Sequence, residues 1–562
     1  MRIRNLVLTL IIVTGVAWGS ALQAVANIEE AYRNGNISLD EKILNKVYLI
    51  FDQSQMAPQF RPESTAILKC GTLILHEYEQ SRSRLAPETT QIVDGYLMPT
   101  MDNRALYDSP GGHFRFSYST TGTNAVPATD SDLSGVPDYV EWAAAYLDYT
   151  WEMEVDSAGF AGPNHVGGDS DGKYNVSFEA MSSYGYTTTA GVDGAELTRL
   201  VLHRNFVGFG SNHDPEGNVK GAMKVTCAHE FKHASQRVHS FWSEGGWVEL
   251  DATWAEEFVF DYVNDSMLNF MGFEDPLSHP HYGLDHGGTG SYEDYLWQDF
   301  IHQRFGENSY SSAEYIQYFW TWRETHQSQS VLASYQQMFS HFGSTFADAF
   351  KEYVVWNYFT GNRAVVVLGQ SMFGYDEAGI NGFPTATLTT THSSYPVTIS
   401  GPSFERLAAR MIRLMPPTAG VQNALEIDFN GQDGAEMFAM WAVRAGNTVE
   451  WGEIPLDGSN DGTFVVDMRG ASEAALIPVV TQTTGTSFNY NYTISGTTVA
   501  ECDAGDLNAD GMLDVTDLVR LVAIILEQGA SATPEEICAA DVNADSAITV
   551  QDVVQLVNII LQ

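Results

Sequence analysis

The chain has 562 residues, more than one hydrophobic core usually organises, so we expect three or more folding units. Its 71 Asp and Glu against 28 Lys and Arg give a formal charge of −43, which would repel nucleic acid and anionic lipid and therefore excludes nucleic-acid binding. Four cysteines are too few to form a disulfide scaffold in a chain of this length.

Residues 1–26 have the pattern of a secretory signal peptide. Arg2 and Arg4 precede an apolar run over residues 6–18, and small residues at positions 24–26 offer a cleavage site. The alternative is an uncleaved membrane anchor, but the run is shorter than the about 20 residues that a span needs. We therefore expect an exported protein, with no membrane span in the mature chain.

Residues 27–105 and residues 106–388 differ in their patterns. The first stretch is predicted to be helical, because "LDEKILNKVYLIF" has apolar residues three and four apart, and it is either a pro-region or an integral cap. The second stretch combines the alternating strand "HFRFSYS" with the helical run "VPDYVEWAAAYLDYTWEMEV". This mixture predicts an α+β enzyme domain.

Residues 389–498 change to short alternating runs, such as "ALEIDF", "MFAMWAV" and "GTFVVDM", between Gly, Asn and Asp turns. This pattern is typical of an all-β sandwich. Residues 501–562 hold two matching segments, whose leading residues Asp506 and Asp541 stand 35 positions apart. The last segment is therefore an internal repeat.

The stretch "HEFKH" has the spacing of a zinc site. Residues four apart on a helix share a face, so His229 and His233 can both direct a ring nitrogen at one tetrahedral zinc, with Glu230 beside them as a base for the metal-bound water. The next helical run, "GGWVELDATWAEEFVFDYVND", contains Glu249 and Glu256. These two lie about 10 Å apart along the helix axis, so only one of them can be the third ligand.

This arrangement resembles the gluzincin metallopeptidases, in which a Glu from a second helix completes a site of two His and one Glu. Trp247, Glu249 and Ala252 match the W-x-x-E-G-x-A arrangement of that family loosely: the Trp lies two residues before the Glu, and Leu250 replaces the Gly. The resemblance implies that Glu249 is the third ligand and that the domain at 106–388 is zincin-like. The alternative third ligands are Glu256, Glu244 and His239.

A wider resemblance covers about residues 39–306. The segments "KCGT", "AVPATDSDLSGVPDYVEWAAAYLDYTWEMEV", "HEFKHASQ" and "YEDYLWQDFIHQRFG" are similar, in order and spacing, to a group of secreted bacterial metallopeptidases. The resemblance implies a zinc-dependent endopeptidase that uses metal-activated water. It also implies a downstream donor to the oxyanion, for which Tyr292 is the candidate, with His281 and His286 behind it. A non-catalytic exported binding protein with structural metal sites is the alternative.

Residues 506–517 and 541–552 have the pattern of calcium-binding loops. Oxygen-bearing side chains occupy loop positions 1, 3, 5, 9 and 12. Gly511 provides the sharp turn in the first loop, and Ser546 stands in place of this glycine in the second loop. Each loop leads into one apolar helix, without a helix before the loop, so the pair resembles a type I dockerin. The expected calcium ligands are Asp506, Asn508, Asp510, Asp514 and Asp517 in the first loop and Asp541, Asn543, Asp545, Thr549 and Asp552 in the second.

The dockerin resemblance implies a cohesin-type scaffold protein as the partner, bound through a helix face near Val515, Thr516, Val550 and Gln551. A calcium-stabilised tail without a partner is the alternative. The predicted fold class is therefore multidomain, with an α+β zincin-like metallopeptidase domain, an all-β sandwich and a small all-α calcium-binding dockerin. We expect a secreted protein that is held on a cell surface or a scaffold.

The cysteines leave several pairings open. Cys502 and Cys538 flank the matching segments and can form a disulfide. For Cys70 and Cys227, we favour a mutual disulfide or buried thiols over a contact from Cys70 to the metal.

Two further acidic stretches, residues 130–138 and residues 169–171, are either calcium sites or turns with solvated carboxylates.

Overall fold

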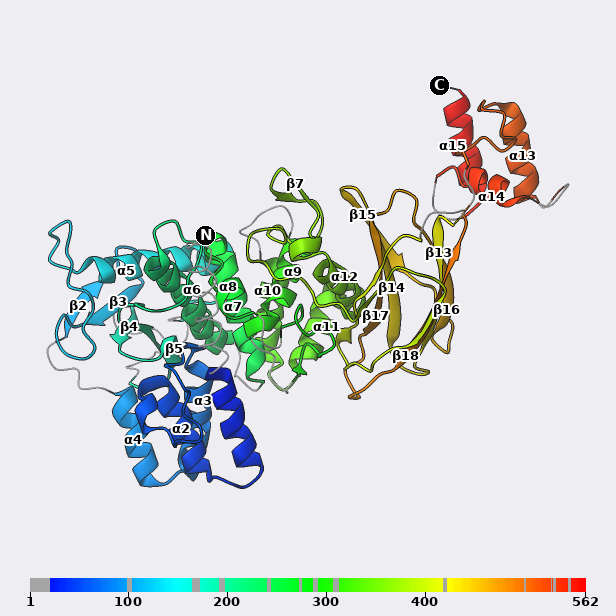
Figure 1. Ribbon diagram of the computed structural model, residues 1–562. Coiled ribbons are helices and arrows are strands. Elements are labelled where there is room, and N and C mark those ends of the chain that lie inside the picture. Colours follow the sequence, from blue (N-terminus) through cyan, green and yellow to red (C-terminus); the bar gives the residue numbers. More distant parts are fainter. Residues whose placement is uncertain are drawn as a thin grey trace, which may run out of the picture. The chain divides into compact units, whose positions relative to one another are not determined.

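The structure is a computed structural model in which the chain divides into two compact units (Figure 1). The first unit runs to Thr389 and includes Ser403–Met411 and Ile477–Phe488; the second holds Thr390–Pro402, Ile412–Leu476 and the rest of the chain from Asn489. The described residues are 21–98, 104–163, 172–191, 198–239, 244–271, 275–286, 292–306, 313–417, 422–499, 502–526, 528, 532–543 and 547–561.

The first unit is built on a six-stranded sheet with the strand order β1-β5-β6-β4-β3-β2. The pairs β1/β5, β3/β4 and β4/β6 are parallel, whereas β2/β3 and β5/β6 are antiparallel. Every residue of β5 and β6 is buried, as in a sheet that is covered on both faces. The strands are β1 (Leu68–Cys70), β2 (Ala105–Asp108), β3 (Phe114–Tyr118), β4 (Tyr174–Glu179), β5 (Ser183–Thr188) and β6 (Arg199–His203).

Residues 27–105 lie in the same compact unit as the residues that follow them. Helix α2 (Leu39–Phe51) forms as predicted, and Ser38 and Glu41 close its N-terminus with a capping box. However, β1 lies within the stretch that was expected to be helical, and it extends the sheet by pairing with β5. A three-residue strand is too short to show an alternating pattern, so the sequence gives no signal for it.

Helix α6 (Asn218–His239) carries the "HEFKH" motif and contacts both β5 and β6. It also packs against α5 (Asp138–Trp151) and α7 (Gly246–Phe260), and it is buried almost all round from Gly221 to Gln236. Gly185 in β5 permits this close approach, because a Cβ there would lie 2.9 Å from the Cγ of Glu230.

The remaining elements of the first unit are mostly helical. A π-helical turn, Glu152–Ser157, follows α5, and a short hairpin pairs β7 (Val366–Val367) with β8 (Gln370–Ser371). No described helix combines the length and apolar character needed to cross a membrane. The other helices are α3 (Thr72–Ser81), α4 (Pro87–Leu97), α8 (Asp265–Asn269), α9 (Tyr295–Phe305), α10 (Glu314–Thr325), α11 (Val331–His341) and α12 (Phe346–Tyr358).

The second unit contains two sheets (Figure 1). Their strand orders are β10-β18-β13-β16 and β15-β14-β17-β12-β9. Alternate residues of β13 are buried and exposed, which is the pattern of a sheet with one face in a core. Two segments within the range predicted for the sandwich, Ser403–Met411 and Ile477–Phe488, belong to the first unit instead. The strands of these sheets are β9 (Thr390–His392), β10 (Val397–Ser400), β12 (Ile412–Leu414), β13 (Ala424–Gly431), β14 (Met437–Ala445), β15 (Thr448–Glu453), β16 (Asp461–Asp467), β17 (Glu473–Val480) and β18 (Tyr490–Thr497). The short strand β11 (Ala408–Ala409) lies in the first of these two segments and pairs with the last two residues of β17, which lie in the second.

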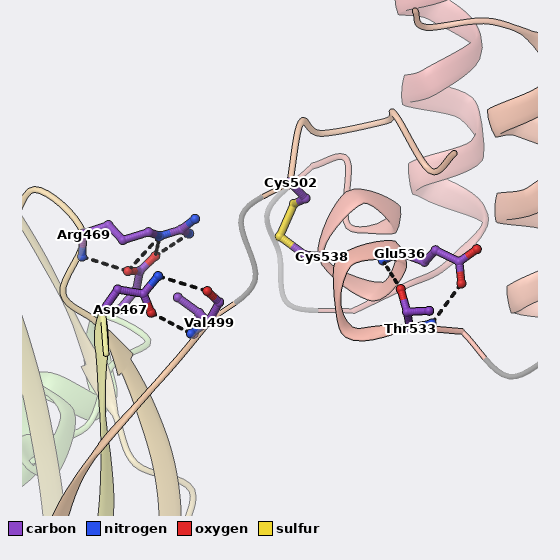
Figure 2. Close-up of a disulfide and its surroundings, with 8 residues drawn as sticks. Asp467, Arg469, Val499, Cys502, Thr533, Glu536 and Cys538 are labelled. Carbon is purple, nitrogen blue, oxygen red and sulfur yellow. Dashed lines mark hydrogen bonds and ion pairs between the residues drawn. A yellow bond between two sulfur atoms is a disulfide. The ribbon is translucent and has the colours of Figure 1, made fainter. Parts of the chain in front are cut away.

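The C-terminal repeat folds into α13 (Val515–Ile525), α14 (Pro534–Ala540) and α15 (Val550–Ile560). Helix α14 directly precedes the second loop and was not expected; Thr533 and Glu536 close its N-terminus with a capping box. Figure 2 shows this cap beside the disulfide between Cys502 and Cys538, the pairing that the flanking positions suggested. The core of the repeat consists of Leu507, Leu521, Ala539, Ala540, Val542 and Leu556.

Candidate metal centre

Four side chains of the first unit bring metal-ligating atoms together: Cys70, His229, His233 and Glu249. The Nε2 atom of His229 lies 3.2 Å from Nε2 of His233 and 3.1 Å from Oε2 of Glu249, and Sγ of Cys70 lies 3.5 Å from Nε2 of His233. A tetrahedral zinc, at about 2.0–2.1 Å from nitrogen or oxygen and about 2.3 Å from sulfur, needs separations of about 3.3 Å and about 3.6 Å respectively. The three distances are therefore close to those of a tetrahedral zinc site, and all four donor atoms lie within 4.8 Å of one another.

Three elements of the fold present these donors. His229 and His233 are one helical turn apart on the same face of α6, Glu249 is in the first turn of α7, and Cys70 is the last residue of β1. All four side chains are buried, with exposed fractions between 0% and 3%.

Both imidazoles are oriented through their second nitrogen. Nδ1 of His229 lies 2.7 Å from Oε1 of Glu256, and Nδ1 of His233 lies 2.9 Å from Oε1 of Gln236. Gln236 is itself fixed, because its amide nitrogen donates to Asp251. These contacts leave Nε2 of each ring directed at the cluster, the orientation that metal-binding histidines require.

The alternative third ligands are engaged elsewhere. Glu256 contacts Nδ1 of His229, the ring nitrogen that is not directed at the cluster. Glu244 accepts hydrogen bonds from the backbone of Val331, and His239 contacts Glu324. The structure thus places Glu249, and none of these three, among the donors.

The charges around the cluster favour a bound cation. Glu230, Glu249, Glu256 and Asp265 are all buried, and the ammonium of Lys69 lies 2.7 Å from Glu256 and 2.9 Å from Asp265. Among the described residues, one oxygen of Glu230 and one of Glu249 have no hydrogen-bond partner. Buried carboxylate oxygens without partners are costly, and a divalent ion at the cluster would stabilise the charge of both carboxylates. The donor set therefore fits zinc.

Glu230, the predicted base, is buried on α6 between the two histidines in sequence. Its Oε2 atom accepts a hydrogen bond from the hydroxyl of Thr72 at 3.0 Å and lies 3.1 Å from the hydroxyl of Thr187. Burial raises the pKa of Glu230, and the charges of the two histidines oppose that shift. Burial also acts to raise the pKa of Glu249, but His233 and His229 bring it down to about 2.

The candidates for an oxyanion donor lie at different places. Tyr292 stacks near His229 at 6.0 Å between ring centroids, and its hydroxyl donates to the backbone oxygen of Cys70 at 3.5 Å. His286 instead contacts Glu405, and burial lowers the pKa of His281 to about 4. Only Tyr292 of these three is near the cluster in the described chain.

Cys70 and Cys227 do not form the disulfide that the sequence analysis favoured as one option. Both are free and buried. The reason is helical geometry: Cys227 is two residues before His229, which turns it by about 200° away from the metal-facing side. A contact of Cys70 with the metal is compatible with the sequence, whereas the roles of Lys69 and Thr72 do not follow from it, although both belong to the "KCGT" segment.

The acidic stretch at residues 130–138 brings together the carboxylates of Asp130, Asp132 and Asp138. The stretch at residues 169–171 lies outside the described residues. A further group that the sequence did not suggest consists of Glu257 and Asp261, at the end of α7 and directly after it, and Glu377.

The first loop of the C-terminal repeat has the turns of a calcium loop. Asp506 accepts from the backbone nitrogens of Asp510 at 3.1 Å and Gly511 at 2.8 Å, and the fully buried Asp517 accepts from Leu507 at 2.9 Å. In the second loop the fully buried Asp552 accepts from Asn543 and from Thr549. Asp545 and Ser546 lie outside the described residues, as do residues 1–20 of the predicted signal peptide.

A family model named "Dockerin type I domain" matches residues 504–561. The C-terminal repeat is a type I dockerin. A dockerin implies calcium binding and a cohesin partner, and dockerins are typical of extracellular, scaffold-attached proteins. The four residues expected at the partner surface, Val515, Thr516, Val550 and Gln551, are all exposed.

No curated protein matches the chain. Among solved structures, the pre-peptidase C-terminal domain of collagenase from Bacillus anthracis is 10% identical, with 20% of this chain and 99% of that chain covered and a TM-score of 0.16. Tripeptidyl peptidase 2 is 7% identical over 20% of this chain and 11% of that chain, with a TM-score of 0.16. A 4-O-methyl-alpha-glucuronidase with specificity for decorated arabinogalactans is 9% identical over 50% of this chain and 39% of that chain, with a TM-score of 0.13. None of these comparisons identifies the chain as a metallopeptidase.

Proposed function

We propose that the protein is an exported, zinc-dependent endopeptidase that its dockerin attaches to a cohesin-bearing scaffold. The observation that carries the proposal is the convergence of His229, His233 and Glu249 at tetrahedral spacing, with the carboxylate of Glu230 beside them. Two imidazoles and one carboxylate from the protein are the ligand set of hydrolytic zinc sites that keep a position for water.

Zinc held by these three residues would supply a Lewis acid and lower the pKa of its bound water toward about 7. Glu230 is placed to take the proton of that water, because Thr72 and Thr187 hold one carboxylate oxygen and leave the other without a partner in the described chain. Glu256 and Gln236 keep the two imidazoles in register. Tyr292 is the proposed donor to the oxyanion of the peptide carbonyl.

A second candidate function is a non-catalytic, scaffold-attached binding protein whose metal stabilises the fold. The observation in its favour is that the donor group has four protein ligands, including Cys70, and is almost fully buried. Structural zinc sites are commonly closed by four protein ligands that include cysteine.

Hydrolysis of a casein-type substrate by the full-length chain separates the two candidates. The peptidase proposal predicts cleavage that a chelator abolishes and that added zinc restores. The metal is structural if the chelator lowers the melting temperature and zinc restores it, but the zinc-loaded protein cleaves no peptide. In that case the variant Cys70→Ala, which lacks the fourth donor, should cleave no peptide either.

A further inference from the structure

The "KCGT" segment, residues 69–72, contacts the candidate metal centre with three consecutive functional groups. Lys69 pairs with Glu256, Cys70 places its sulfur 3.5 Å from Nε2 of His233, and the hydroxyl of Thr72 donates to Glu230. The segment belongs to β1 and the start of α3, well before the motif helices in the sequence. This one short segment therefore contacts a proposed ligand, the carboxylate that orients His229, and the proposed base.

We infer that Cys70 is a fourth ligand of the metal centre and that its thiolate keeps the centre closed to water. The inference rests on the proposed function, because closure matters only where a water would otherwise react. Coordination exchanges the thiol proton for the metal: the proton leaves to solvent, and a sulfur lone pair occupies the position of the water oxygen. No oxidant or reductant is needed.

Burial and the nearby carboxylates of Glu230 and Glu249 raise the pKa of the Cys70 thiol, so its thiolate needs a bound cation beside it. The backbone N–H of Thr72 donates to Sγ of Cys70 at 3.2 Å, and the sulfur lies at the N-terminus of the ten-residue helix α3. A helix N-terminus stabilises a negative charge, and it is a common setting for reactive or metal-binding thiolates. The buried oxygen of Glu249 without a partner in the described chain is a second sign that a cation belongs here.

The segment is held firmly in place. β1 pairs with β5, and Lys69 is 1% exposed between two buried carboxylates. Gly71 is closely packed, because a Cβ there would lie 3.2 Å from Ile50 and 3.3 Å from Tyr186. If the whole segment moved away from the metal centre, the buried acids would lose the cation of Lys69. The smallest movement that opens the centre to water is therefore that of the Cys70 side chain alone.

X-ray absorption spectroscopy of the zinc-loaded, full-length protein tests the ligand directly. We expect one sulfur at about 2.3 Å in the wild type, no sulfur in Cys70→Ala, and an unchanged sulfur signal in the matched control Cys227→Ala, whose thiol is also buried and free. Peptide hydrolysis should rise about 10-fold or more in Cys70→Ala and stay at the wild-type rate in Cys227→Ala, because a water-accessible minor state is populated at about 10% or less.

A wild-type spectrum without sulfur overturns the inference, whatever the activity, and this result needs no variant to fold. A sulfur ligand together with equal hydrolysis by the wild type and Cys70→Ala overturns the closure. If neither protein cleaves peptide although zinc is bound, the proposed peptidase function and the closure both fail, and the spectrum still decides whether Cys70 is a ligand.

Discussion

Replacing Lys69 with Met should destabilise the first unit strongly. Lys69 is the cation between Glu256 and Asp265, and the side chains of both acids are 0% exposed. Removing one partner of a buried ion pair costs about 3–5 kcal/mol, because the remaining charge stays buried and unpaired. With a urea m-value of about 2–3 kcal/mol/M, the unfolding midpoint of this unit should fall by about 1–2 M.

The matched control is Arg82→Met, since Arg82 pairs with Asp94 at the surface and its side chain is 52% exposed. Surface pairs contribute at most about 1 kcal/mol, so this midpoint should barely move. Adding Asp265→Asn to Lys69→Met should restore part of the lost stability, because it removes one of the two stranded charges. If Lys69→Met is no more destabilising than Arg82→Met, Lys69 does not stabilise the two buried acids.

Three further outcomes are expected. Glu249→Ala should lose zinc, whereas Glu256→Ala should weaken zinc binding or activity by about 10–100-fold, as judged by metal content after competition with a chelator; the reverse order would assign the third ligand to Glu256. Burial raises the pKa of Glu154 from 4.5 to about 8, so the native protein retains a proton that the unfolded chain releases. The free energy of unfolding should therefore fall by up to about 1.4 kcal/mol per pH unit as the pH rises from 4.5 to about 8. Urea unfolding of Glu154→Gln should lack this part of the pH dependence. Residues 501–562 should become helical only when calcium is added, and a fully helical circular dichroism spectrum in excess chelator would contradict this.

Long periodic segments of the fold could be predicted from the sequence. Helix α2 begins and ends at the expected residues, because three- and four-residue spacing of apolar side chains is visible over thirteen positions. Strand β1 could not be predicted, since it has three residues and its parallel partner β5 lies more than a hundred residues further along. The inclusion of Ser403–Met411 in the first unit likewise depends on tertiary contacts, which leave no local pattern in the sequence.

The candidate site was predictable to the extent that helix geometry determines it. The spacing of His229 and His233 requires a shared face, and the structure brings both to one cluster. The role of Cys70 could not be decided, because the direction of its side chain depends on the register between β1 and β5. The direction of the Cys227 side chain could be predicted, since its position on α6 turns it away from His229.

The central claim is that Glu230 activates a zinc-bound water, and the most direct measurement is the turnover and zinc content of Glu230→Gln on the same sample. We expect a full complement of zinc and a turnover at least about 10²-fold below that of the wild type, because the amide cannot accept the proton. Turnover near the wild-type rate, with zinc bound, would contradict it.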